Sequence, residues 1–197
     1  AKIDASLTRT PTHSYPVAVE PDEYQRRLTR CREQMSALGI ELLYVTAPEG
    51  QCYLHGYEVS WYQAASTRHW IPATATVVHV DHDRLIFING EDPVPCAAHD
   101  RRSVGAATFG ADDELFERVV RMLQDEAWLR DGTVVGLEYW SYLPPPAVSH
   151  RLNAAFRTQG AEVVDGSDVL RLVRQTKSEA EIETLEHAAR IGDIGMA

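Results

Sequence analysis

The chain has 197 residues, 44% hydrophobic and 24% charged, a composition typical of a globular protein that buries one core without disulfides or a metal. Its formal net charge of −10 argues against a nucleic acid or an anionic membrane as the main partner, since both attract basic surfaces. No apolar run approaches the ~20 residues of a membrane span, and the three separated cysteines (Cys31, Cys52 and Cys96) form no C-x-x-C motif, so we expect a protein of the reducing cytoplasm.

The first quarter of the chain predicts an arm, a helix and a strand. Residues 1–19 are polar, contain prolines and lack the apolar segment of a secretory signal, so they predict an extended arm. Residues 21–39 predict an amphipathic helix that begins with proline and ends at glycine. Its apolar stripe comprises Tyr24, Leu28, Cys31, Met35 and Leu38. The run "IELLYVTA" predicts a buried strand, and "GQCYLHGY" predicts a second, irregular one.

The rest of the chain predicts further strands and helices. "PATATVVHV" and "RLIFING" predict a β-hairpin linked by "DHD". A helix over 112–129, a strand in "GTVVGLEY", a helix over 144–160, and a strand with a short helix or turn over 161–176 follow. Alternating strands and helices indicate an α/β layer fold, and the hairpin makes its sheet mixed rather than purely parallel.

The C-terminal segment predicts a helix with a well-defined start and no stop. Ser178 and Glu181 have the spacing of a capping box, in which each side chain accepts from a backbone N–H of the other residue. Ile182, Leu185 and Ala189 then form an apolar face, and apolar residues continue to the last position. This pattern fits a frayed terminal helix, and it equally fits the first helix of another domain.

Two clusters contain metal-ligand residue types without a convincing metal-site pattern. "HVDHD" has His79, Asp81, His82 and Asp83, but alternate side chains of a strand face opposite ways, so His82 should point away from His79. A polar hairpin turn is the preferred interpretation. "CAAHD" is interpreted as a surface loop for the same reason. The sequence contains no P-loop, G-x-G-x-x-G or G-x-S-x-G motif.

The segment "HGYEVSWYQAASTRHW" is the strongest candidate for a binding site. It concentrates six aromatic or basic side chains that could hold a small ligand: Tyr57, Trp61, Tyr62, Arg68, His69 and Trp70. Aromatic rings beside an Arg or His form good walls for small polar or cationic ligands. The same residues also suit a protein interface or packing at a sheet edge, and the pattern leaves all three open.

Three stretches together resemble the creatinase/prolidase family. "EYQRRLTRCREQMSALGIELLYVTAPEGQCYLHGY" is similar to the family's opening helix and strand, and "GTVVGLEYWSYLPPPAVSHRLNAAF" to its later G-x-E strand and helix. "VLRLVRQTKSEAEIETLEHAARIGDIGMA" resembles the inter-domain junction and is the most specific of the three. The resemblance implies an N-terminal domain over 20–175 with a ribonuclease H-like, three-layer α/β fold. Residues 176–197 would be a linker and the first helix of an absent C-terminal domain.

The resemblance also implies a function. Family members hydrolyse C–N bonds in Xaa-Pro dipeptides or in small amidino or amide compounds, and the chemistry belongs to the C-terminal "pita-bread" domain. Metallopeptidase members hold two divalent metals there (Mn, Co or Zn), whereas creatinase-type members use a histidine, and the sequence leaves this choice open. We therefore expect an inactive, non-catalytic domain without a cofactor of its own, which supports a homodimer and helps to close the neighbouring subunit's active site over a small molecule or dipeptide.

The candidate residues for that closing role are Trp61, Tyr62, Arg68 and His69, because creatinase-like members supply an aromatic residue and an Arg from the matching region. The segment is longer here than in creatinase, so the match is by residue type rather than by position. Two other hypotheses remain. The parent could be a peptidase-like protein that has lost catalysis and binds other proteins, or the chain could be a self-sufficient α/β domain that binds a ligand at the aromatic segment.

Overall fold

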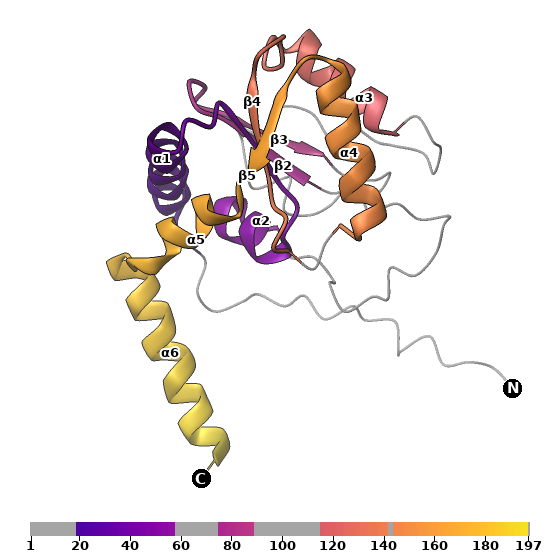
Figure 1. Cartoon of the computed structure of the whole chain (residues 1–197). Coiled ribbons are helices and arrows are strands. Elements are labelled where there is room, and N and C mark those ends of the chain that lie inside the picture. Colours follow the sequence, from indigo (N-terminus) through magenta and orange to yellow (C-terminus); the bar gives the residue numbers. More distant parts are fainter. Residues whose placement is uncertain (1–18, 58–74, 89–114, 142–143, 197) are drawn as a thin grey trace, which may run out of the picture.

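The computed structural model describes residues 19–57, 75–88, 115–141 and 144–196 (Figure 1). These residues form a sheet whose five strands are β1 (Leu42–Val45), β2 (Ala75–His79), β3 (Leu85–Ile88), β4 (Val134–Leu137) and β5 (Glu162–Asp165). The strand order is β3-β2-β1-β4-β5. The β2–β3 hairpin and the β1–β2 pair are antiparallel, whereas β1, β4 and β5 run parallel. The predicted mixed sheet and its hairpin are therefore confirmed.

Helices cover both faces of this sheet and give the predicted three layers (Figure 1). One face carries α1 (Pro21–Ala37), α2 (Pro48–His55) and α5 (Ser167–Gln175), and the opposite face carries α3 (Leu115–Asp125) and α4 (Pro146–Thr158). The last helix, α6 (Glu179–Met196), extends away from the layers. No helix in the described ranges is long and apolar enough to cross a membrane.

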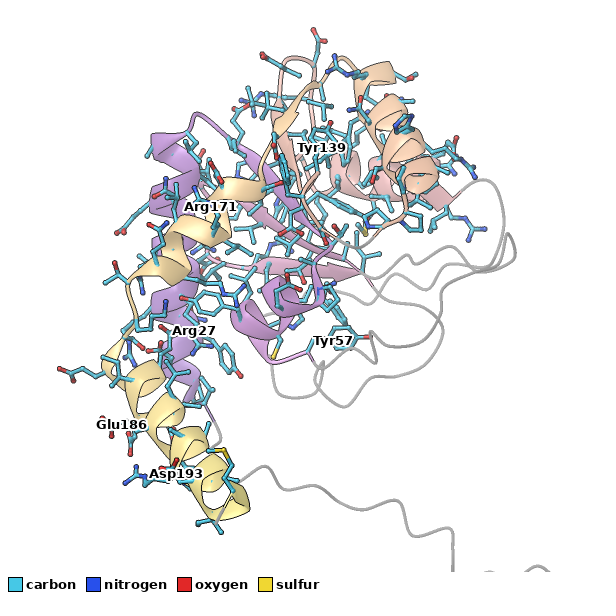
Figure 2. The ribbon with its side chains drawn as sticks, turned by 60° about the horizontal axis from the view of Figure 1, so that its bottom comes forward. Arg27, Tyr57, Tyr139, Arg171, Glu186 and Asp193 are labelled. Atoms are coloured by element: carbon cyan, nitrogen blue, oxygen red, sulfur yellow. The ribbon has the colours of Figure 1, made fainter. Side chains whose placement is uncertain are left out.

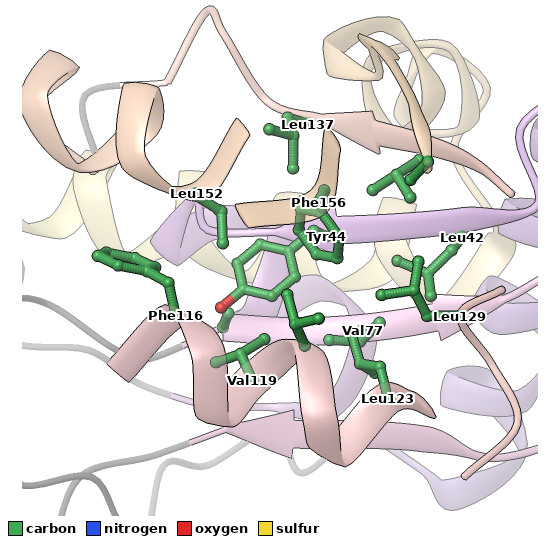
Figure 3. Close-up of a cluster of buried hydrophobic side chains, with 14 of the residues drawn as sticks. Leu42, Tyr44, Val77, Phe116, Val119, Leu123, Leu129, Leu137, Leu152 and Phe156 are labelled. Atoms are coloured by element: carbon green, nitrogen blue, oxygen red, sulfur yellow. The ribbon is translucent and has the colours of Figure 1, made fainter. Parts of the chain in front are cut away.

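The two faces of the sheet have separate apolar cores, as the period of two in a strand requires. In β1, Leu42 and Tyr44 point towards α3 and α4, where the Tyr44 ring meets that of Phe156 edge-on at 5.8 Å (Figure 3). Leu43 and Val45 point the other way, into the core under α1, α2 and α5. A strand buried on both faces explains the continuous apolar run "LLYV" in the sequence.

The prediction of a strand in "GQCYLHGY" is wrong, because this stretch lies in helix α2. Pro48 occupies the first turn, where its missing N–H costs nothing, and Gly56 ends the helix at φ 77° with its N–H donating to the carbonyl of Cys52 at 2.8 Å. Leu54 and His55 face the sheet and are buried. Tertiary packing against the sheet thus overrides the β-like composition of a short segment.

The predicted helix α1 is confirmed, but its buried face differs from the predicted stripe. Leu28, Cys31 and Met35 are buried as expected, whereas Leu38 is 45% exposed because it follows the last helical turn. The same buried face includes two charged residues near the N-terminus of α1, Glu23 and Arg27. Their burial points to a polar site beneath this end of the helix.

Candidate functional site

The four predicted ligand-binding residues lie outside the described part of the chain. Trp61, Tyr62, Arg68 and His69 all fall in 58–74, so their role stays a prediction. The neighbouring Tyr57 is described and is buried, with its ring 4.7 Å from that of Phe87 and 6.2 Å from that of His55 (Figure 2). For this one aromatic residue, packing against the sheet is therefore observed.

The "HVDHD" stretch forms the predicted polar hairpin turn, although its side chains are arranged differently from expectation. β2 ends at His79, and the following residues turn, so the rings of His79 and His82 come within 4.6 Å instead of pointing apart. The His82 ring also stacks on the buried indole of Trp128 at 5.1 Å. Among the residues that the structure describes, no three His, Cys, Asp or Glu side chains could hold one metal ion. Cys96, His99 and Asp100 lie outside those residues.

A buried polar cluster joins the start of α6 to the start of α1. The predicted capping box is confirmed: the Glu181 N–H donates to Ser178 Oγ at 3.2 Å, and the Ser178 N–H donates to Glu181 Oε2 at 2.9 Å. The Ser178 hydroxyl also donates to Glu23 Oε1 at 2.7 Å. A local capping box is thereby extended by a contact between residues far apart in the sequence.

Glu23 is the acceptor at the centre of this cluster. Its side chain is 1% exposed and accepts hydrogen bonds from Arg26 Nη2 at 2.7 Å and from Arg27 Nε at 3.2 Å, besides the bond from Ser178. Burial by itself would raise the pKa of the Glu23 carboxyl, but the hydrogen bonds from Ser178 and Arg26, with the charge of Arg27, bring it below its ordinary value. The carboxylate is consequently ionised and satisfied inside the fold.

Arg27 is the cation that connects three helices. Its Nε lies 3.2 Å from both Glu23 Oε1 of α1 and Glu181 Oε1 of α6, and its Nη1 donates to the carbonyl of Tyr53 in α2 at 3.0 Å (Figure 2). The guanidinium carbon lies 4.5 Å from the centroid of the Tyr53 ring, a cation–π contact. A buried Arg with this many partners fixes its neighbours geometrically, since its planar fork admits few arrangements.

No described residue of α6 is fully buried, and the Glu181 side chain in its first turn, at 13% exposed, is the one held in the cluster. Glu186 and Asp193 lie further along α6, away from the sheet (Figure 2). Five large apolar side chains of α6 are exposed: Ile182, Leu185, Ile191, Ile194 and Met196. They occupy more than one side of the helix, with Ile194 78% exposed. Large apolar side chains exposed together in this way mark an interaction site.

A second feature is a groove of about 620 Å³ at the carboxyl edge of the parallel strands. Ala47 follows β1 there, Glu138 and Trp140 follow β4, and Ser167 begins α5 after β5. Glu138 Oε2 accepts from the N–H groups of Thr46 and Ala47 at 2.6 and 2.7 Å, so this carboxylate fixes the turn that leads from β1 into α2. Burial nevertheless raises the pKa of Glu138, and the nearby charge of Glu49 adds to that effect.

A comparison of the sequence with known protein families identifies the domain. The Creatinase/Prolidase N-terminal domain matches residues 27–176. The chain belongs to this family. The match spans most of the chain and ends just before the capping box of α6. A comparison with curated proteins gave no significant match.

Solved structures of similar fold agree with the family assignment. A prolidase from Thermococcus sibiricus has a TM-score of 0.66 and 15% identity over 90% of this chain, which spans 43% of the prolidase. The N-terminal domain of the cytoplasmic peptidase PepQ from Mycobacterium tuberculosis H37Rv has a TM-score of 0.55 and 13% identity, covering 75% of this chain and 98% of that domain. The Creatinase/Prolidase N-terminal domain of an X-PRO dipeptidase from Streptococcus pyogenes has a TM-score of 0.55 and 12% identity. The match covers 75% of this chain and 98% of that domain. At these identities the likeness establishes the fold.

Glu23 and Arg27 are functional-site candidates that sequence reasoning missed. Both lie in the helix predicted over 21–39, where charged residues are ordinarily assigned to the solvated face. The available signal was their position, because Glu23 and Arg27 are four residues apart and each directly precedes a residue of the predicted apolar stripe, Tyr24 and Leu28. Their partners on α6 lie more than 150 residues away, beyond the reach of any local pattern.

Proposed function

We propose that this chain is the non-catalytic N-terminal domain of a C–N bond hydrolase of the creatinase or Xaa-Pro dipeptidase type, and that it positions a second domain through α6. The observation that supports this proposal is a contrast within α6. Its first turn is fixed by Glu23, Arg27 and Ser178, while its remaining turns expose apolar side chains. Such a helix requires a cover, and a following domain of the same protein would supply it. Residues 176–197 are then the linker and first helix of that domain.

The hydrolase assignment of the parent is supported by the family membership and by relatives described as prolidase and X-PRO dipeptidase. On this proposal the reaction, and the two divalent metals or the histidine that it uses, belong to the second domain. A cytoplasmic location fits the composition, and the relative PepQ is described as cytoplasmic.

The domain is also proposed to contribute to a homodimer and to narrow the neighbouring subunit's active site. Trp61, Tyr62, Arg68 and His69 are the residues proposed to contact the substrate, a small molecule or dipeptide. An aromatic wall with a cation can exclude water and orient a ligand without donating a proton. Trp61→Ala and Arg68→Ala in the full-length protein should raise KM or lower kcat without lowering Tm, and unchanged kinetics in both variants would remove this role.

The main test compares the 197-residue chain with the protein encoded by the complete gene. With Mn²⁺, Co²⁺ or Zn²⁺, the 197-residue chain should not hydrolyse an Xaa-Pro dipeptide, whereas the full-length protein should hydrolyse such a dipeptide or a creatine-like compound. Leu185→Lys in the full-length protein should lower its stability and activity, because this side chain would be buried there. Metal-dependent turnover by the 197-residue chain would refute the proposal. A full-length protein without metal ligands, catalytic histidine or turnover would instead be a peptidase-like binding module.

A further inference from the structure

The groove at the carboxyl edge lies where open α/β sheets bind their ligands. The chain leaves β1 for β2 on one side, while β4 and then β5 lie on the other, so β1 and β4 flank the point at which the strand order reverses. Ligands of such sheets bind outside the carboxyl ends of the strands at this point. Ala47 and Glu138, which follow these two strands, both line the groove. Its volume of about 620 Å³ is within the range of small-molecule sites.

The wall of the groove that is formed by α5 and the residues just after it presents cations. Arg171 is neutralised by its own neighbour, since its Nε lies 2.6 Å from Asp168 Oδ1. Arg174 and Lys177 have no carboxylate partner in an ion pair among the described residues. The Arg174 guanidinium lies 5.8 Å from the centroid of the Tyr53 ring, and Lys177 Nζ donates to the backbone carbonyl of Gln175 at 3.3 Å. Two cations on one wall are thus available to an anionic group.

The floor of the groove restricts which anion can enter. The Glu138 carboxylate already accepts from the backbone N–H groups of Thr46 and Ala47, just before α2, so these two donors are not available to an entering anion. Glu49 adds a second carboxylate in the first turn of the same helix. A phosphate dianion would be repelled by both groups, and the repulsion increases with each added negative charge. A single carboxylate directed at Arg174 and Lys177 incurs less of this repulsion.

Apolar groups complete the site. Trp140 is 87% exposed at the groove rim, and its backbone N–H donates to Ser167 Oγ at 3.1 Å, which fixes the start of the segment after β4 next to α5. Leu170 lines the α5 wall. We propose that the groove binds a small organic monocarboxylate, with its carboxylate on Arg174 and Lys177 and its apolar part against Trp140 and Leu170. This inference is independent of the proposed function, because the groove is formed by the N-terminal domain and the first residues after α5 and needs no second domain.

The test follows the ¹⁵N-labelled 197-residue chain by ¹H–¹⁵N NMR during titration with three probes: benzoate, its neutral isostere benzamide, and inorganic phosphate. The indole N–H signal of Trp140, which is assigned by its loss in Trp140→Phe, reports binding at the rim of the groove. Benzoate should shift this signal in a saturable way, while benzamide and phosphate should leave it unchanged over the same concentrations. Arg174→Gln and Lys177→Gln should each weaken benzoate binding about tenfold, the effect of losing one charge-assisted hydrogen bond.

Arg190→Gln is the matched control, since Arg190 is an exposed arginine of α6 outside the groove. It should bind benzoate as the unaltered chain does, and far-UV circular dichroism should show that all three variants are folded. Equal shifts with benzamide, tighter binding of phosphate, or unchanged benzoate affinity in both folded groove variants would overturn the proposal. A poly-glutamate peptide that shifts Trp140 when benzoate does not would assign the groove to a protein partner, which would also overturn it.

Discussion

Glu23→Gln is the most direct test of the cluster that fixes α6. The substitution keeps the size of the side chain but replaces the carboxylate, which accepts hydrogen bonds from Ser178, Arg26 and Arg27 at 2.7–3.2 Å, by a neutral amide. A hydrogen bond to a charged group contributes about 1.5–3 kcal/mol, and the bond from Arg26 is discounted because that side chain is 60% exposed.

Two effects limit the loss of stability in Glu23→Gln. The substituted glutamine would still offer one carbonyl acceptor, and Arg27 would keep Glu181 as its counter-ion at 3.2 Å, so the larger cost of a stranded buried charge does not apply. The expected decrease in the free energy of unfolding is therefore about 2–3 kcal/mol. For a chain of this size, that corresponds to a drop in Tm of about 5–10 °C.

Urea denaturation followed by far-UV circular dichroism would measure this decrease, with Glu33→Gln as the control on the exposed side of α1. The pH dependence supplies a second readout. Because folding lowers the pKa of Glu23 below its ordinary 4.5, its contribution is present above pH 4.5 and is lost as the pH falls through the folded-state pKa. The stability difference between the two proteins should shrink accordingly in acid. A loss below about 0.5 kcal/mol at pH 7, or a difference independent of pH, would refute this account of the cluster.

Three further predictions concern a buried histidine, a buried glutamate and a pair of glycines. Burial lowers the pKa of His55 to about 4, so the protein should lose stability as the pH falls from about 6.5 towards 4, and His55→Asn should flatten that part of the stability profile. Glu138→Gln should have the opposite pH dependence to Glu23→Gln, because the folded-state pKa of Glu138 is raised. The unaltered protein should gain stability relative to the variant as the pH falls. Urea titrations at pH 7 and pH 5 would detect this gain. Gly56→Ala should be more destabilising than Gly39→Ala in thermal melts, although both glycines have positive φ, because only at Gly56 would the new Cβ meet a side chain, Tyr24 Oη at 2.6 Å; equal Tm values would contradict this.

The sequence predicted the elements whose evidence is local. The helix of residues 21–37, the hairpin around "DHD" and the capping box of Ser178 and Glu181 each depend on residues within a few positions of one another. Helix α2 was missed because its eight residues are too few for a clear apolar period, although Pro48 and Gly56 have the positions typical of a helix start and stop. His82 was misplaced because the strand period was extended past the end of β2.

The sequence by itself therefore determined the α/β class, the mixed sheet and the family, because the period of apolar residues, the turn residues and the stretches that resemble the family are all encoded along the chain. Only the tertiary structure brought Glu23 to Ser178 and Arg27 to Glu181, and only the packing of the sheet placed Arg174, Glu138 and Trp140 around one groove. Contacts of this kind arise where separate elements meet, and their geometry follows from packing that no local spacing specifies.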